Sequence, residues 1–194
     1  ARGARKPNSQ FLAATNPFSF GEFELFEGRS TYTVAKVSIR NYFRELAADF
    51  NAAYYGFYFL EFADYYCQEN NDETEMLKLL YQTLRALESP AFSNRLVRCI
   101  YELKTLTING EAPNVFGCTK CGKKKELHWF SGKTARMLCD HCVNELRRKP
   151  ENMAALPTYQ KVQESTVYTM QYIMTAKLAK LSTFSVSDQV LWEL

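Results

Sequence analysis

The stretch that decides how this chain is organised is GCTKCGKKKELHWFSGKTARMLCDHC, residues 117–142, which holds four of the six cysteines. They form two Cys-x-x-Cys pairs, Cys118 with Cys121 and Cys139 with Cys142, separated by 17 residues. Two residues within a pair let a tight turn aim both sulfurs at one ion, and 17 residues are enough for a short hairpin to bring the second pair round. The spacing therefore predicts a four-thiolate Zn²⁺ site.

The alternatives to zinc are disulfides, unrelated free thiols and a redox-active Cys-x-x-Cys. Cys67 and Cys99 lie in helical apolar patterns, as reduced thiols do, and no secretory signal is visible, which favours a reducing compartment and a metal. A catalytic zinc keeps an open coordination position, whereas four cysteines complete a tetrahedron without His128 or His141. The sequence also has neither the His-x-Glu of zinc deaminases nor a His-Glu-x-x-His motif. We therefore interpret the metal as structural, with no catalytic residues.

The residues between the two pairs predict a hairpin with strands at 125–130 and 133–138 and a turn at Ser131-Gly132. Gly117 and Gly122 stand where knuckle backbones need unusual dihedral angles. Structural zinc contributes about 10–16 kcal/mol in small peptides, whereas a whole domain is stable by about 5–15 kcal/mol. We expect this lysine-rich lobe to depend on its ion for folding.

On the N-terminal side, residues 18–26 and 31–39 alternate apolar and polar side chains around a turn, which predicts a β-hairpin. An isolated hairpin is marginal in water, so it needs further strands. Helical periods follow at 41–67, 70–87, 90–107 and 165–181, with a last helix capped by Ser185. Asn70 and Glu73 resemble a capping box. The aromatic residues of 54–66 are expected to pack mainly in the core.

These elements predict an α+β protein that is mostly α-helical. The expected domains are residues 1–40 (basic leader and hairpin), a helical domain of 41–113 with 151–194, and an inserted zinc lobe of 114–150. The longest strongly apolar uncharged run, residues 50–60, is too short to span a bilayer, so no membrane association is expected.

The charge is unevenly spread. Residues 114–150 hold nine Lys and Arg against three Asp and Glu, whereas residues 41–113 hold six against eleven. The leader is basic as well, so basic segments flank an acidic one. Such a distribution indicates an anionic partner that meets only part of the surface.

The order of the motifs resembles the bacterial recombination protein O (RecO) family. The motifs are ARGARKPNS with NPFSFGEFELFEGRSTYTVAKVSI, then YYGFYFLEFADYY, then Tyr101–Leu106 leading through GEAPNVFGCTKCG, and finally STVYTMQYIMTAKLAKLSTFSVSDQVLWEL. The resemblance implies that residues 1–40 are the later strands of an oligonucleotide-binding (OB-fold) barrel. Because the barrel of this family begins with further strands and its last helix usually continues, the resemblance implies that strands precede Ala1 and that the final helix is longer than this sequence shows.

The resemblance also implies a function. Members of this family are non-enzymatic recombination mediators in DNA repair. They bind single-stranded and duplex DNA, anneal complementary strands and, with RecR, help RecA onto strands coated by single-stranded-DNA-binding protein (SSB), whose C-terminal tail they bind. A cytoplasmic, nucleoid-associated bacterial protein is implied.

Two basic clusters are the candidate DNA contacts. They are Arg2, Arg5 and Lys6 in the leader, and Lys123, Lys124, Lys125, Arg147, Arg148 and Lys149 in the zinc lobe. Both clusters also fit a plain solvated surface. Two other functions remain open: a zinc-stabilised protein–protein adaptor without nucleic-acid binding, and a Cys-x-x-Cys redox enzyme.

Overall fold

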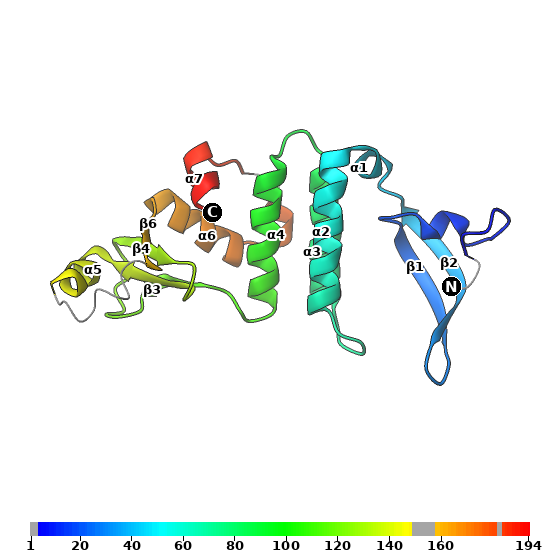
Figure 1. The fold of residues 1–194 in the computed structure, drawn as a ribbon, viewed down its shortest axis with the longest axis horizontal. Coiled ribbons are helices and arrows are strands. Elements are labelled where there is room, and N and C mark those ends of the chain that lie inside the picture. The colour runs from blue at the N-terminus through cyan, green and yellow to red at the C-terminus, as the bar shows by residue number, and fades with distance from the viewer. Residues whose placement is uncertain (1–3, 149–157, 182–183) are drawn as a thin grey trace.

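The computed structural model describes residues 4–148, 158–181 and 184–194, which form an elongated body (Figure 1). The helices are α1 (Arg44–Ala48), α2 (Phe50–Tyr66), α3 (Thr74–Leu87), α4 (Asn94–Ile108), α5 (Asp140–Arg147), α6 (Glu164–Thr175) and α7 (Asp188–Glu193), with 3₁₀ turns η1 (Leu12–Thr15) and η4 (Leu178–Lys180). The strands are β1 (Phe20–Glu27), β2 (Tyr32–Asn41), β3 (Asn114–Cys118), β4 (Leu127–Ser131), β5 (Arg136–Cys139) and β6 (Gln160–Lys161). This mixture of helices and small sheets agrees with the predicted α+β class. Within the described ranges, no helix is long and apolar enough to cross a membrane.

Three parts follow one another along the long axis (Figure 1). The β1–β2 hairpin lies at one end, α2, α3 and α4 stand side by side in the middle, and the sheet of β3 to β6 with α5 lies at the other end. The hairpin is antiparallel from Phe20 opposite Asn41 to Glu27 opposite Tyr32, which confirms the predicted strands. The rest of a barrel stays a prediction.

The predicted single helix over 41–67 is wrong, because polar side chains divide this segment. Strand β2 runs to Asn41, whose side-chain Oδ1 accepts a hydrogen bond of 3.0 Å from the N–H of Phe43. Phe43 is left-handed, with φ of 45°, and its ring is buried. Asp49 is extended and accepts a 2.8 Å bond from the N–H of Ala52, so it ends α1 and caps α2.

The middle part is held by aromatic packing between α2 and α4. Tyr101 and Phe59 are both fully buried, with ring centroids 4.4 Å apart, and the Tyr101 hydroxyl donates to the Phe59 carbonyl at 2.8 Å. The expectation of an aromatic core is therefore confirmed on this side of α2. It is wrong on the opposite side, where Tyr54, Phe57 and Tyr65 are exposed.

Two predicted helix caps are also wrong. Asn70 takes a left-handed φ of 65° before α3, and the side chain that accepts from the N–H of Thr74 is Asp72, at 3.1 Å. The cap of α7 is Ser187, which accepts from Val190, rather than Ser185. In both cases several Asx or Ser residues precede the helix, and the tertiary path of the chain decides which one caps it.

Helix α6 ends at Thr175, earlier than the predicted end at residue 181. A buried lysine contacts the carbonyl groups at this helix end. The Nζ of Lys104, from α4, donates to the carbonyls of Met174 and Ala176 at 2.9 and 2.7 Å. A cation at the C-terminus of a helix satisfies carbonyls that lack intrahelical donors. Burial lowers the pKa of Lys104.

We expect Lys104→Met to lower the free energy of unfolding by about 1–3 kcal/mol at pH 7, because two carbonyls lose their donor. The difference should depend on pH. Since burial lowers the pKa of Lys104 in the folded chain, the unfolded chain binds this proton more tightly. The stability of the wild type relative to the variant should therefore rise with pH, until the pH passes the unfolded lysine pKa of about 10.4. Urea unfolding of both proteins between pH 7 and 10.5 measures this.

The control is Lys78→Met on α3, where the lysine is exposed and pairs with Glu75 on the surface. We expect that variant to stay within about 0.5 kcal/mol of the wild type. If the difference in unfolding free energy between the wild type and Lys104→Met stays constant over the pH range, burial does not lower the pKa of Lys104 as stated.

Candidate metal centre and basic surfaces

The first cysteine pair lies on a knuckle at the end of β3. The N–H of Cys118 donates to the carbonyl of Lys123, and the N–H of Gly122 donates back to the carbonyl of Cys118, both at 2.8 Å. Gly122 has a φ of 74°, a conformation that glycine adopts without strain, as predicted. Gly117 does not have a positive φ, so that part of the prediction is wrong.

The second pair lies where β5 meets α5. Cys139 is the last residue of β5, and Cys142 is in the first turn of α5. Strand β5 pairs parallel to β3 and antiparallel to β4, which brings the two pairs together. The predicted hairpin is present as β4 and β5, but Ser131 is the last residue of β4 and the turn lies at 132–135.

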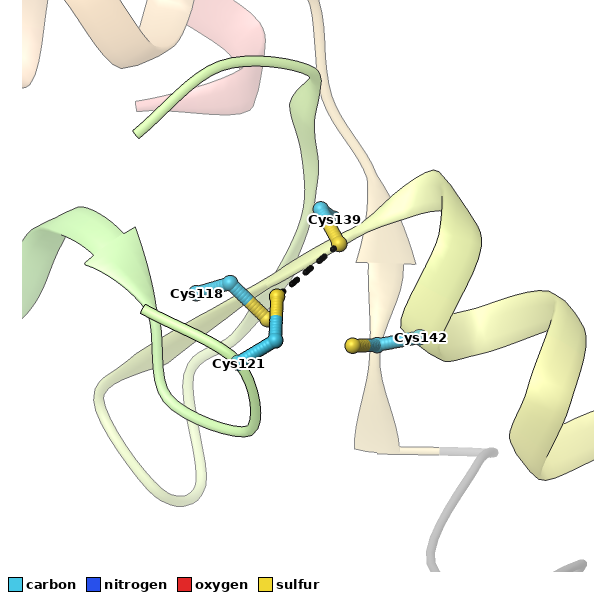
Figure 2. A group of neighbouring side chains, drawn as sticks. All are labelled: Cys118, Cys121, Cys139 and Cys142. Atoms are coloured by element: carbon cyan, nitrogen blue, oxygen red, sulfur yellow. Dashed lines mark hydrogen bonds between the residues drawn. The ribbon is translucent and has the colours of Figure 1, made fainter. Parts of the chain in front are cut away.

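The four sulfurs form one compact group. All four Sγ atoms lie within 4.8 Å of one another, and those of Cys121 and Cys139 are 3.7 Å apart. Four sulfurs at about 2.3 Å from one ion on a tetrahedron are about 3.8 Å apart. Figure 2 shows the side chains converging from the knuckle on one side and from β5 and α5 on the other. The group can hold a metal ion, and its ligand set is compatible with zinc.

The surroundings of the thiols shift their pKa values in different directions. Burial raises the pKa of both Cys139 and Cys142. Burial also opposes ionisation of Cys118, but hydrogen bonds from the backbone of Cys139, Cys121 and Lys120 outweigh it and lower its pKa to about 6. The backbone therefore favours the thiolate form of Cys118, and a cation held by the group would supply the charge that lets the other sulfurs ionise.

An acidic residue between the ligands fixes the surrounding structure. Asp140 accepts from Nε1 of Trp129 and is hydrogen-bonded to Nδ1 of His128, both at 2.8 Å. The guanidinium of Arg147 lies over the Trp129 ring, 4.6 Å from its centroid. These contacts tie β4 to α5, which carry the residues on both sides of the sulfur group. Sequence reasoning missed Asp140, because nothing in the local pattern marks its partners.

The sheet of the zinc lobe continues beyond the cysteines, in the order β3-β5-β4-β6. In β6, Lys161 lies opposite Trp129 of β4. Nε2 of Gln171, in α6, donates to the Val115 carbonyl of β3 at 2.7 Å, so α6 closes the core of the lobe. The predicted boundary at residue 150 lies outside the described residues, and the lobe contacts segments on both sides of it.

The basic candidates of the lobe differ in their surroundings. Lys123 pairs with Glu126, and Arg147 is held over Trp129. Lys124, Lys125 and Arg148 are exposed, and Lys149 lies outside the described residues. Three other exposed cations share the lobe and were missed by the sequence, namely Lys133, Arg136 and Lys161. Lys161 reaches it only through the pairing of β6, which no local signal reveals.

The leader candidates lie at the other end of the molecule (Figure 1). Arg5 and Lys6 are exposed and line a hollow whose walls include Phe11 and Phe23, while Arg2 lies outside the described residues. The structure thus does not bring the two basic clusters together. The helices α2, α3 and α4 stand between them.

A largely helical protein with an N-terminal hairpin and a lobe whose four cysteines can hold a metal ion is the class that this fold and site define. The family model described as "Recombination protein O C terminal" matches residues 47–194. The chain therefore belongs to the RecO family. This confirms the resemblance found in the sequence motifs.

Three curated relatives, each named DNA repair protein RecO, show the extent of the similarity. The protein of Alkaliphilus metalliredigens is 32% identical over 143 residues, which cover 73% of this chain and 58% of that protein. The protein of Acetivibrio thermocellus is 29% identical over 195 residues, which cover 100% of this chain and 74% of that protein. The protein of Symbiobacterium thermophilum is 32% identical over 149 residues, which cover 75% of this chain and 59% of that protein. The matched region is thus less than two thirds of the first and third relatives.

Proposed function

We propose that this chain is part of a non-enzymatic recombination mediator in DNA repair, which binds single-stranded DNA through the basic surface of its zinc lobe. Two findings support the proposal: membership of a family whose relatives are named DNA repair proteins, and the exposed cations of the lobe. The observation that carries the DNA-binding part is that Lys124, Lys125 and Arg148 are exposed and follow the two cysteine pairs closely in the sequence. A cytoplasmic, nucleoid-associated location follows from this role.

Zn²⁺ is the metal that we propose for Cys118, Cys121, Cys139 and Cys142. Bound there, it supplies cohesion between the knuckle and α5, since four sulfurs leave no open position for a reacting water. The lobe then acts as a rigid carrier of its basic side chains. Three of the four thiols are buried, which suits a structural site.

The proposed binding is electrostatic. Lys and Arg side chains neutralise phosphates and release the counterions condensed on the nucleic acid, so binding is sensitive to salt and largely indifferent to sequence. Such contacts suit single-stranded and duplex DNA alike, and they are compatible with annealing. Arg5 and Lys6, beside the aromatic hollow of the hairpin, offer a second contact at the far end of the molecule.

Protein partners are proposed from family membership: RecR, the C-terminal tail of SSB, and RecA indirectly. The tail is acidic and apolar, so it suits an apolar groove with a nearby cation. One pocket between α3, α4 and η4 has that character, with Leu79, Phe92, Ile100 and Leu178 in its walls. Arg85 lines an adjoining pocket that shares Phe92.

A salt titration tests the DNA-binding proposal. The affinity of the chain for a fluorescent oligothymidine is measured by anisotropy between 50 and 300 mM NaCl. Three phosphate contacts predict a log–log slope of roughly −2, at about −0.7 per contact on single strands. An affinity indifferent to salt, or no binding, would contradict the proposal.

The second candidate is the zinc-stabilised adaptor that binds only proteins. It is favoured by the ion pairs of Lys120 with Glu145 and of Lys123 with Glu126, which reduce the free positive charge of the lobe. The same titration separates the two functions, because the adaptor predicts no binding to the oligothymidine.

A further inference from the structure

Helix α2 presents an exposed row of aromatic side chains. Phe50, Tyr54, Phe57 and Tyr65 are exposed by 84%, 73%, 48% and 82%. Their spacing of four, three and eight residues places them on one side of a helix. The buried residues of α2, namely Ala52, Gly56 and Phe59, lie on the opposite side. We call the row Phe50, Tyr54, Phe57, Glu61, Asp64 and Tyr65 the aromatic face.

This face is not explained by packing within the described part of the chain. Helix α2 packs on α1, α3 and α4 through its other side. At one point the segment that precedes β1 touches the face, where the rings of Phe18 and Phe57 lie 4.8 Å apart. Single exposed aromatics are common, but a contiguous exposed apolar surface on a soluble domain marks an interaction site. Tyr and Trp are also the residues that most often anchor protein interfaces.

The charged side chains of the aromatic face are both acidic. Glu61 and Asp64 are exposed between the aromatic rings. From residue 45 to residue 77 the chain has eight Asp and Glu and no Lys or Arg. Arg98 of α4 lies over Tyr58 of α2 and is already paired with Glu102 at 2.7 Å.

We propose that the aromatic face is a docking surface for a basic, apolar segment of a partner protein, such as an amphipathic helix that carries Lys or Arg beside Leu or Phe. The apolar side chains of the segment would cover the rings. Its cations would pair with Glu61 and Asp64 and lie over the faces of Tyr54 and Tyr65.

Two other occupants fit the charge less well. Nucleic acid is repelled, because the carboxylates meet phosphates. A second copy of the chain that pairs face to face would bring two acidic surfaces together, which costs free energy. A basic protein segment satisfies both the rings and the carboxylates.

This surface is separate from the proposed DNA contacts. In Figure 1, α4 stands between α2 and the zinc lobe, so the two can be occupied together. The proposed docking surface therefore does not rest on the proposed DNA binding, and an experiment that refutes one of them does not affect the other.

The test uses a defined probe, because the partner is unidentified. The probe is a fluorescent 20-residue peptide with Leu on one helical side flanked by Lys, and its control carries Glu in place of Lys. We expect the chain to bind the Lys peptide and not the Glu peptide. The variant Tyr54→Ser with Tyr65→Ser should weaken binding at least tenfold, and Glu61→Lys with Asp64→Lys should do the same.

The matched control is Trp192→Ser in α7, where an aromatic side chain is exposed by 73% on a helix that is not part of the aromatic face. It should bind the Lys peptide as the wild type does. Circular dichroism melting checks that every variant is folded, which is expected because the changed side chains are on the surface.

Three results would overturn the proposal. The first is equal binding of the Lys peptide by the wild type and both double variants. The second is binding of the Glu peptide as tightly as the Lys peptide. The third is a dimer in sedimentation equilibrium that the Tyr54→Ser, Tyr65→Ser variant abolishes, which would assign the face to a second copy. Oligothymidine affinity should be the same in the wild type, in the Tyr54→Ser, Tyr65→Ser variant and in Trp192→Ser, whatever the peptide result, because these changes do not alter the charge.

Discussion

Replacing Cys139 by Ser is expected to remove the metal and unfold the zinc lobe, while α2, α3 and α4 stay folded. Cys139 is fully buried at the junction of β5 and α5, and its Sγ faces that of Cys121. Structural zinc contributes about 10–16 kcal/mol in peptides, which is comparable with the whole stability of a domain. We therefore expect the lobe to lose its largest single stabilising contribution when the ion is lost.

Hydrogen-exchange mass spectrometry measures this prediction segment by segment. Peptides from 114–148 should lose protection in the variant or after chelation, whereas peptides from α2 and α4, with Phe59 and Tyr101 in their core, should keep theirs. The control is Cys99→Ser on α4, since that thiol lies outside the sulfur group. A Cys139→Ser protein with full zinc content and an unchanged exchange pattern would contradict the structural role of the ion.

The triple change Lys124→Gln, Lys125→Gln and Arg148→Gln is expected to weaken oligothymidine binding on the order of 100-fold at 0.1 M salt. Three phosphate contacts are lost, so the log–log salt slope should become shallower by roughly 2. The fold should not change, because all three side chains are exposed and none supports the sulfur group. Anisotropy titrations at several salt concentrations measure affinity and slope together.

Lys78→Gln is the matched control, because this exposed lysine pairs with Glu75 on α3, away from the lobe. It should leave the affinity and the slope unchanged. If the triple variant binds as the wild type does, the zinc lobe is not the DNA contact and the leader, with Arg5 and Lys6, becomes the remaining candidate.

The parts of the structure predicted correctly are those that local chemistry dictates. The two Cys-x-x-Cys pairs lie together as their spacing predicted, and Gly122 is needed where the first knuckle turns. The alternation of residues 18–39 likewise predicted β1 and β2, because a pleated strand has a period of two. Family membership followed from the order of these motifs.

The parts that were missed depend on contacts between distant residues. The break before α2 requires Asn41 to accept from the N–H of Phe43 and Asp49 to cap α2, and both residues lie in a segment whose pattern looks helical throughout. The strand at 160–161 is only two residues long and is defined by its partner β4. The aromatic face was taken for core, because periodicity shows that Phe and Tyr fall on both sides of α2 but not which side is covered.

Sulfur and zinc X-ray absorption on the purified, unchelated protein tests the metal centre most directly. We predict one Zn²⁺ per chain, coordinated by four sulfurs at about 2.3 Å. Chains that carry no stoichiometric metal, or a first shell with nitrogen or oxygen in place of a sulfur, would contradict the four-cysteine site.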